Sequence, residues 1–166
     1  MSGDSNFEPL VAELAELCEA GGLRVATAES CTGGWIAKVL TDRAGSSAWF
    51  ERGFVTYSNL AKQEMLGVDA GLLEDPGAVS REVVEAMARG ALTGSDAQLA
   101  VAVSGIAGPE GGSEDKPVGT VWLAWARGDE LRSACECFRG DREAVRMATV
   151  KLALQGLVYS AGTPRE

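Results

Sequence analysis

The chain has 166 residues, of which 46% are hydrophobic, 23% charged and 6% aromatic, a composition that indicates a globular domain and excludes a disordered or collagen-like chain. Its formal net charge of −9 makes the surface repel phosphate backbones, so we expect no nucleic-acid partner. Because histidine is absent, a Ser-His-Asp triad, a Cys-His pair and an H-E-x-x-H zinc site are all excluded.

The first elements alternate between helix and strand. Residues 7–20 carry apolar side chains at helical spacing and end at Gly21-Gly22, which predicts an amphipathic helix. The patterns then predict a strand over 23–27, a helix over 35–40, a strand over 53–58 and a short helix capped by Asn59.

The second half begins with a helix over 80–93 and continues with strands. The apolar run 99–103 is typical of a strand covered on both faces. Strands over 119–126 and 132–138 flank a turn, and a long helix over 141–159 closes the pattern. This order predicts a single-domain, three-layer α/β fold in which helices flank a mixed β-sheet.

The N-terminal segment and the length of the apolar runs bear on location, and the spacing of the cysteines bears on metal binding. Residues 1–5 do not begin a signal peptide, and no apolar run approaches the length of a membrane span, so we predict a cytoplasmic protein with no membrane partner. The four cysteines lack metal-ligand spacing, so no metal is expected. Cys18, Cys135 and Cys137 are interpreted as small buried hydrophobes.

Two glycine-rich loops follow strands that are predicted to be buried. The first is Ala28-Glu29-Ser30-Cys31-Thr32-Gly33-Gly34, and the second begins at Ser104 and continues through residues 105–112. Neither loop matches a P-loop or a G-x-G-x-x-G motif. Because ligands of open α/β sheets bind at the carboxyl ends of strands, the two loops together predict a ligand site.

Ser30 is the candidate nucleophile of that site. Without histidine its base must be a lysine, a carboxylate or a tyrosine, and Lys62 and Tyr57 are the local candidates. The alternative interpretation of Lys62 is a solvated residue on a helix surface. From spacing alone, both interpretations stay open.

Four blocks of sequence, in order, resemble the CinA C-terminal domain family. The blocks are residues 27–34, residues 53–59 with Lys62, residues 77–80, and residues 104–121. The resemblance implies one domain over residues 1–166 with a core of residues 7–160. It also implies hydrolysis of the carboxamide of nicotinamide mononucleotide (NMN) to nicotinic acid mononucleotide and ammonia, without a cofactor, in pyridine-nucleotide recycling.

The same resemblance implies roles for individual residues. Ser30 would attack the carboxamide carbon, Lys62 would accept its proton, and Tyr57 would relay or orient that proton. Backbone amides from Cys31 to Gly34 would stabilise the oxyanion at the start of a helix. The candidate substrate-binding residues are Glu29, Thr32, Gly33, Gly34, Ser47, Ser104, Gly105, Ala107, Gly108 and Arg142.

Several alternatives stay open at this point. Ser47 is a rival nucleophile, the thiol of Cys31 is another, and Arg139 and Arg146 compete with Arg142 for the phosphate. Glu29 is expected to bond Lys62 or a ribose hydroxyl, or else to be solvated. A non-catalytic nucleotide-binding module and a competence-related interaction domain are the alternative functions. The resemblance further implies a homodimer or larger homo-oligomer.

Overall fold

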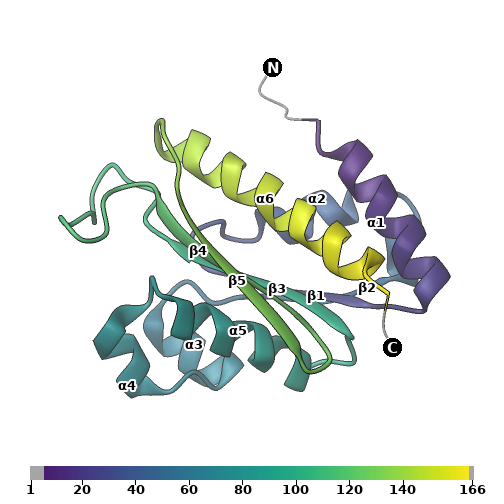
Figure 1. Cartoon of the computed structure of the whole chain (residues 1–166), viewed down its shortest axis with the longest axis horizontal. Helices are drawn as coiled ribbons and strands as arrows, with labels where there is room; N and C mark the ends of the chain where they lie inside the picture. The colour runs from purple at the N-terminus through teal and green to yellow at the C-terminus, as the bar shows by residue number, and fades with distance from the viewer. Residues whose placement is uncertain (1–5, 165–166) are drawn as a thin grey trace.

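A five-stranded sheet forms the middle layer of the chain, whose residues 6–164 are described by a computed structural model (Figure 1). The strands are β1 (Val25–Glu29), β2 (Phe50–Val55), β3 (Leu99–Gly105), β4 (Thr120–Arg127) and β5 (Glu130–Cys137). They lie in the order β2-β1-β3-β4-β5. β1 pairs in parallel with β2 and β3, and the other two pairings are antiparallel, which confirms the predicted mixed sheet.

Helices cover both faces of the sheet, as Figure 1 shows. On one face lie α1 (Glu8–Gly21), α2 (Trp35–Thr41) and α6 (Arg142–Gly162), and on the other lie α3 (Asn59–Leu66), α4 (Ala70–Leu72) and α5 (Arg81–Thr93). Two short helical turns lie between these elements: Ser46–Ala48 connects α2 to β2, and Leu73–Gly77 connects α4 to α5. The three-layer α/β fold expected from the sequence is therefore confirmed.

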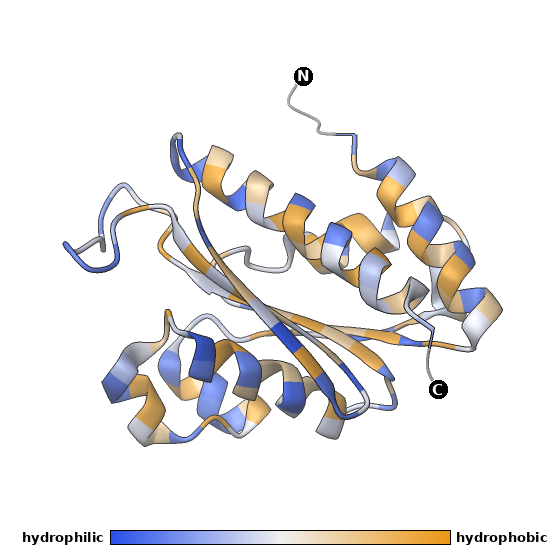
Figure 2. Cartoon of the chain, in the orientation of Figure 1, coloured by the Kyte–Doolittle hydropathy of each residue, from blue (hydrophilic) through white to orange (hydrophobic). Residues whose placement is uncertain are grey.

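The two faces of the sheet are packed with side chains of different size. Toward α1, α2 and α6, β3 presents Leu99, Val101 and Val103. Toward α5 it presents Ala100 and Ala102, together with alanines of β1 and β4. Apolar residues follow the strands and the inward sides of the helices (Figure 2). Every residue from Leu99 to Val103 is fully buried, as the apolar run predicts.

The parallel pairing of β1 with β3 determines where the two glycine-rich loops meet. Glu29 is in register with Val103, so the strands end at the same edge of the sheet. The amide of Ser30 donates to the carbonyl of Val103 at 3.2 Å. The Ser30 turn and the Ser104 loop are therefore neighbours, although 74 positions separate them in sequence.

Several boundaries differ from the sequence prediction. β1 begins and ends two residues later than expected, and β2 lies over 50–55 instead of 53–58. Thr56 and Tyr57 consequently leave the strand, and Ser58, not Asn59, caps α3 by accepting from the amide of Ala61 at 3.0 Å. The predicted helix over 80–93 is present as α5, and the hydroxyl of Ser80 caps it by accepting from the amide of Val83 at 3.2 Å.

The prediction for the cysteines is correct only for Cys18. Cys18 is buried, whereas Cys135 and Cys137 are exposed. They lie on β5, an edge strand with β4 as its single partner in the described sheet, and its last residues are exposed. Residues two positions apart on a strand, such as Cys135 and Cys137, share one face. The sequence does not show whether another layer covers that face.

Gly156→Ala is expected to destabilise the fold strongly. A methyl group at Gly156 would overlap the indole ring of Trp125, whose nitrogen donates to the carbonyl of Ala153 at 3.0 Å. We expect a loss of about 1–3 kcal/mol in unfolding free energy, the usual cost of overpacking a core. Urea denaturation measures it, with Gly162→Ala as control because that methyl group would meet Leu17 at an ordinary 3.5 Å. Equal stability of the two variants would contradict this packing argument.

Candidate active site

A pocket of about 290 Å³ lies at the carboxyl ends of β1 and β3. One wall is the Ser30 turn, a second is formed by the residues after β2, and a third is the loop that follows β3. Arg142 from the start of α6 completes the lining. The structure thus brings Ser30, Lys62 and the Ser104 loop together around one hollow, in agreement with their predicted proximity.

The amine of Lys62 is held by three hydrogen bonds. Its side chain is 1% exposed, and Nζ lies 2.9 Å from the hydroxyl oxygen of Ser30. The carbonyl oxygens of Thr56 and Tyr57 each lie 3.0 Å from the same nitrogen. When the amine is neutral, its two N–H groups satisfy these carbonyls, and its lone pair faces the hydroxyl of Ser30. Lys62 is therefore not a solvated surface residue.

Burial lowers the pKa of Lys62 from its ordinary value, because an ammonium group loses hydration in this position. The neutral amine is consequently more populated near neutral pH than in an exposed lysine. A general base requires that state. The geometry and the direction of the pKa shift both suit proton transfer from Ser30 to Lys62.

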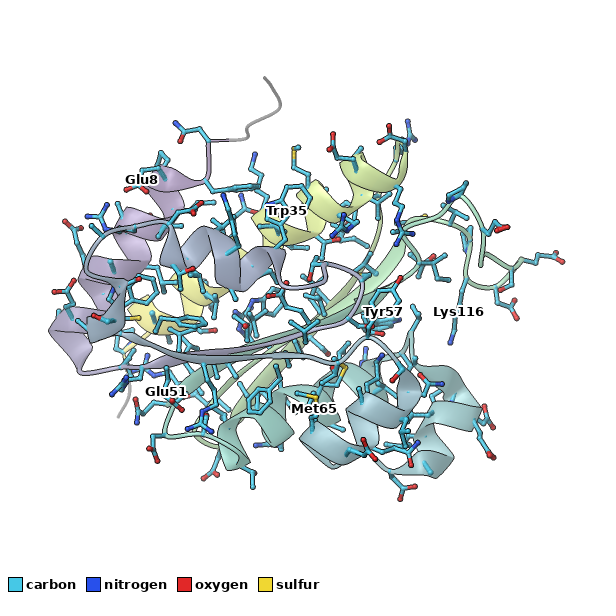
Figure 3. All side chains as sticks on the ribbon, turned by 180° about the vertical axis from the view of Figure 1, so that it is seen from behind. Glu8, Trp35, Glu51, Tyr57, Met65 and Lys116 are labelled. Carbon is cyan, nitrogen blue, oxygen red and sulfur yellow. The ribbon has the colours of Figure 1, made fainter. Side chains whose placement is uncertain are left out.

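Tyr57 contributes its main chain to this arrangement. Its carbonyl oxygen accepts from Lys62, and also from the hydroxyl of Ser30 at 3.4 Å. The phenol is 61% exposed, and its oxygen accepts from Nη2 of Arg142 at 3.2 Å. Figure 3 shows Tyr57 on the side of the molecule from which the loop bearing Lys116 projects. The expected proton relay through the phenol is therefore not present in this structure.

Glu29 is occupied within the fold. Its carboxylate is fully buried and accepts from the hydroxyl of Thr32 at 2.5 Å and from the amides of Ile36 and Ala37 at 2.9 Å each. It thus caps α2, which has no side-chain cap of its own. The structure brings neither Glu29 nor the Thr32 side chain into the pocket, so the expected bonds of Glu29 to Lys62 or a ribose hydroxyl are not formed.

Gly33 and Gly34 shape the turn and lie outside the pocket lining. Their φ angles are +60° and +104°, the left-handed region that glycine adopts without a steric cost. The first amides of α2 are occupied by Glu29, so they are not available to an oxyanion. Within residues 6–164, the amides of Cys31, Thr32 and Gly34 have no hydrogen-bond acceptor. Thr32 is fully buried, and neither it nor Gly34 lines the pocket, so the Cys31 amide is the candidate oxyanion donor of this segment.

The structure separates Ser47 from the pocket. Ser47 lies in the helical turn that precedes β2, and Phe50 at the start of β2 is in register with Val25 at the start of β1. Ser30 follows the other end of β1, about 16 Å away for five extended residues. The expectation that Ser47 lies across the pocket, where it would rival Ser30 as nucleophile, is therefore wrong.

The thiol of Cys31 lines the pocket next to Ser30. Burial raises its pKa to about 11, because a thiolate is poorly solvated there. The nucleophilic form of a cysteine is the thiolate, and it is scarce at neutral pH under these conditions. This environment disfavours the rival thiol mechanism.

The opposite wall of the pocket is built from Ser104, Gly105, Ala107 and Gly108. Arg142 joins this wall to Tyr57, because Nη1 donates to the carbonyl of Gly108 at 2.8 Å while Nη2 donates to the phenol. The sequence analysis predicted all five residues to bind the substrate, and the structure brings them together in the lining of one pocket. Among the described residues, Arg142 forms no ion pair, so its charge has only neutral acceptors.

Six residues line the pocket without having been predicted as site residues: Asn59, Ala78, Val79, Ile106, Glu110 and Gly111. Their only sequence signal was a position beside a predicted site element. Arg146 donates from Nε to the carbonyl of Cys31 at 3.0 Å and from Nη2 to that of Thr32 at 3.1 Å. The sequence suggested Arg146 only as a rival for the phosphate, because nothing local indicates a contact across 115 positions.

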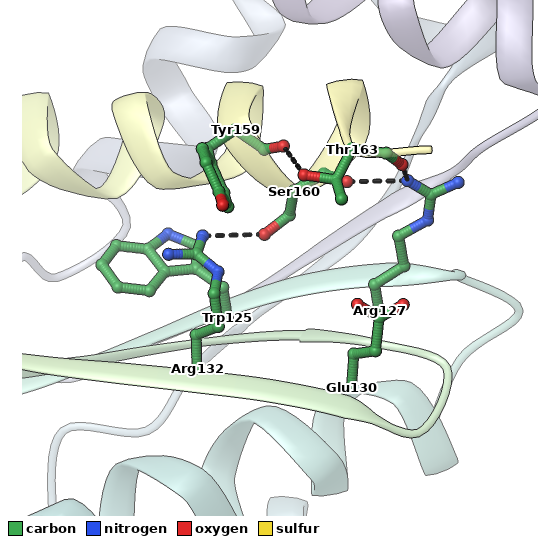
Figure 4. Close-up of a pocket in the computed structure, with 7 residues that line it drawn as sticks. All are labelled: Trp125, Arg127, Glu130, Arg132, Tyr159, Ser160 and Thr163. Carbon is green, nitrogen blue, oxygen red and sulfur yellow. Dashed lines mark hydrogen bonds between the residues drawn. The ribbon is translucent and has the colours of Figure 1, made fainter. Parts of the chain in front are cut away.

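A second hollow, of about 110 Å³, lies between β4, β5 and the end of α6 (Figure 4). Arg127 donates there to the carbonyls of Ser160 and Thr163 at 2.7 and 3.0 Å. Arg132 donates to the hydroxyl of Ser160 at 2.9 Å, and its guanidinium lies 4.4 Å from the ring centre of Tyr159. Both cations thus bind the C-terminal end of α6. We interpret this hollow as a place where Arg127 and Arg132 hold α6 against the sheet, not as a ligand site.

Residues 6–164 contain no group of three or more cysteine, aspartate, glutamate or histidine side chains able to hold an ion. No helix within these residues has the length and apolar character needed to cross a membrane.

The fold and site define an α/β domain with a histidine-free serine–lysine pair beside a glycine-lined pocket. The chain belongs to the CinA C-terminal domain family, whose model matches residues 7–160. It is 58% identical to nicotinamide-nucleotide amidohydrolase PncC of Escherichia coli (strain K12), over 93% of this chain and 94% of that protein.

Two further comparisons extend this similarity. The protein of the same name from Pseudomonas putida is also 58% identical, over 90% of this chain and 93% of its own. The crystal structure of competence/damage inducible protein CihA from Agrobacterium tumefaciens superposes with a TM-score of 0.92 at 48% identity. The superposition covers 98% of this chain and all of the other. The fold and most of the length are therefore shared with these relatives.

Proposed function

We propose that this protein hydrolyses the carboxamide of NMN to nicotinic acid mononucleotide and ammonia. The observation that carries the proposal is the 2.9 Å contact between the buried amine of Lys62 and the hydroxyl of Ser30 inside a nucleotide-sized pocket. The names of the relatives from E. coli and P. putida support the choice of substrate.

The reaction proceeds in two stages. Neutral Lys62 takes the proton of Ser30 as Oγ attacks the carboxamide carbon, and the resulting oxyanion is stabilised by backbone amides of the Ser30 turn. The C–N bond then breaks, and Lys62 returns the proton to the departing ammonia. Water attacks the acyl-serine ester with Lys62 again as base, which yields the carboxylate and regenerates the hydroxyl of Ser30.

The nucleotide occupies the wall opposite Lys62. The guanidinium of Arg142 binds the phosphate, because charge-assisted hydrogen bonds to phosphate are stronger than those to its present neutral partners. Ser104, Gly105 and the amides of Ala107 and Gly108 complete the cradle. Tyr57 keeps Arg142 at the edge of the pocket and orients Lys62 through its carbonyl oxygen.

Ammonia release from NMN by the purified protein tests the proposal directly. Glutamate dehydrogenase detects the ammonia, and chromatography identifies the acid product. Binding of NMN without ammonia release would overturn the enzyme in favour of a nucleotide-binding module. Neither binding nor turnover would favour the competence-related interaction domain. A purely phosphate-binding cradle gives no reason to bury a lysine against a serine.

Arg142→Met is expected to raise KM for NMN about 10- to 100-fold, the effect of losing a hydrogen bond from a charged group worth about 1.5–3 kcal/mol. The value of kcat should change much less, since Arg142 does not touch Ser30 or Lys62. Steady-state kinetics with NMN and with nicotinamide riboside, which lacks the phosphate, separate these effects. Arg139→Met is the matched control, because Arg139 is exposed and does not line the pocket. An equal rise in KM for NMN and for nicotinamide riboside would contradict the assignment of Arg142 to the phosphate.

The cytoplasmic location and the homodimer or larger homo-oligomer stay predictions. Light scattering combined with size-exclusion chromatography measures the oligomeric state.

A further inference from the structure

Arg146 reaches the Ser30 turn from α6, which carries neither member of the serine–lysine pair. Its Nε and Nη2 donate to the carbonyls of Cys31 and Thr32 at 3.0 and 3.1 Å. Its guanidinium also lies 5.5 Å from the ring centre of Trp35, the first residue of α2. Figure 3 shows Trp35 beside α6. The guanidinium is therefore fixed on two successive carbonyls and on an aromatic face.

Several amides of this turn are already used. Ser30 donates to Val103, Gly33 donates to the carbonyl of Ser30 at 3.1 Å, and the first amides of α2 donate to Glu29. In the described part of the chain, the amides of Cys31, Thr32 and Gly34 have no acceptor, and Cys31 is the one of these three residues that lines the pocket. The Cys31 amide directly follows the proposed nucleophile.

The clamp fixes the backbone that carries the Cys31 amide. On one side of that amide, Arg146 holds the carbonyls of Cys31 and Thr32. On the other side, the amide of Ser30 is held by its hydrogen bond to Val103. The Cys31 amide is thereby kept between two fixed points beside the pocket that Cys31 lines.

We propose that Arg146 is a positioning residue for amide hydrolysis. It holds the carbonyls of Cys31 and Thr32 so that the amide of Cys31 donates to the oxyanion that forms when Ser30 attacks the carboxamide. This inference rests on the proposed function. Arg146 does not line the pocket, and its Nε and Nη2 are bonded to the turn, so the geometry opposes the phosphate-binding role that the sequence left open for it.

Kinetics of Arg146→Ala and Arg146→Lys test the proposal. We expect kcat for NMN to fall about 10- to 100-fold in the alanine variant, somewhat less than the loss of a whole oxyanion donor. KM should stay within about threefold, because an oxyanion contact is made only in the transition state. Lysine keeps a cation but lacks the planar fork, so Arg146→Lys should show a smaller loss, again in kcat.

Chemical rescue separates positioning from a general loss of structure. Millimolar guanidinium should restore part of kcat in Arg146→Ala, and it should leave Lys62→Met unchanged. Lys151→Met is the matched control on α6, an exposed cation outside the pocket lining, and should keep wild-type kcat and KM. If Arg146→Ala does not fold, the kcat of Arg146→Lys decides.

Three results would overturn the inference: unchanged kcat in both Arg146 variants, a loss confined to KM, or a loss that guanidinium does not restore in a folded alanine variant. Wild-type protein that releases no ammonia from NMN would instead refute the proposed function. The two failures are therefore distinguishable.

Discussion

Ser30→Ala is expected to abolish ammonia release from NMN, with a loss of about 10⁴-fold or more in kcat, since removal of a nucleophile eliminates the covalent route. Ser30 is 8% exposed, and its hydroxyl contacts the amine of Lys62 and the carbonyl of Tyr57. Alanine removes the attacking atom and leaves the backbone of the turn in place. A coupled ammonia assay on the purified variant measures the loss.

Cys31→Ala is the matched control for this substitution. The thiol lines the same pocket, and burial raises its pKa to about 11, so it is protonated under assay conditions near neutral pH. We expect this variant to keep most of the wild-type activity, because only its backbone is assigned a role. An inactive Cys31→Ala together with an active Ser30→Ala would reverse the assignment of the nucleophile.

Lys62→Met is expected to lower kcat by about 10²–10⁴-fold, the usual contribution of a positioned general base. Methionine fills a similar volume but has no amine to accept the proton of Ser30. Binding of NMN should be nearly unchanged, because Lys62 is assigned to proton transfer and Arg142 to the phosphate. Lys38→Met is the control, since Lys38 is an exposed lysine paired with Asp42 on α2.

The pH dependence gives an independent measure of the same lysine. Protonated Lys62 cannot act as a base, so kcat/KM should rise with a slope of one as pH increases through the folded-state pKa. Burial lowers that pKa, which places this limb below the ordinary lysine value of about 10.4. A near-normal kcat with a greatly raised KM in Lys62→Met would instead identify Lys62 as a phosphate ligand.

The sequence by itself determined the element order, the mixed sheet and the candidate pair Ser30 and Lys62. The spacing of apolar residues follows the repeat of a helix or of a strand, which is a local property of the backbone. A strand buried on both faces, such as 99–103, is recognised by a continuous run of apolar residues. The four blocks that resemble the CinA C-terminal domain family contributed the activity and the proximity of Lys62 to Ser30. The start of α5 was predicted to within one residue, whereas the cap of α3 was assigned to Asn59 instead of Ser58.

Only the tertiary structure decided which polar groups face the pocket. Glu29 is adjacent to Ser30 in sequence, yet its carboxylate is buried on the amides of α2. The Tyr57 side chain contacts Arg142, while its carbonyl oxygen orients Lys62. Strand alternation and the exact end of β2 control these directions, because a shift of one residue reverses the face that a side chain occupies.

Long-range contacts were equally beyond the sequence. Ser47 lies in a glycine- and serine-rich loop. Nothing in the sequence of that loop shows that it lies at the opposite end of β1 from Ser30. Arg146 reaches Cys31 across 115 positions because α6 packs over the start of α2. Local patterns encode the elements, whereas the partners of a side chain depend on how distant elements pack. That packing placed Ser30 and Lys62 in one pocket and Arg146 on the turn beside it.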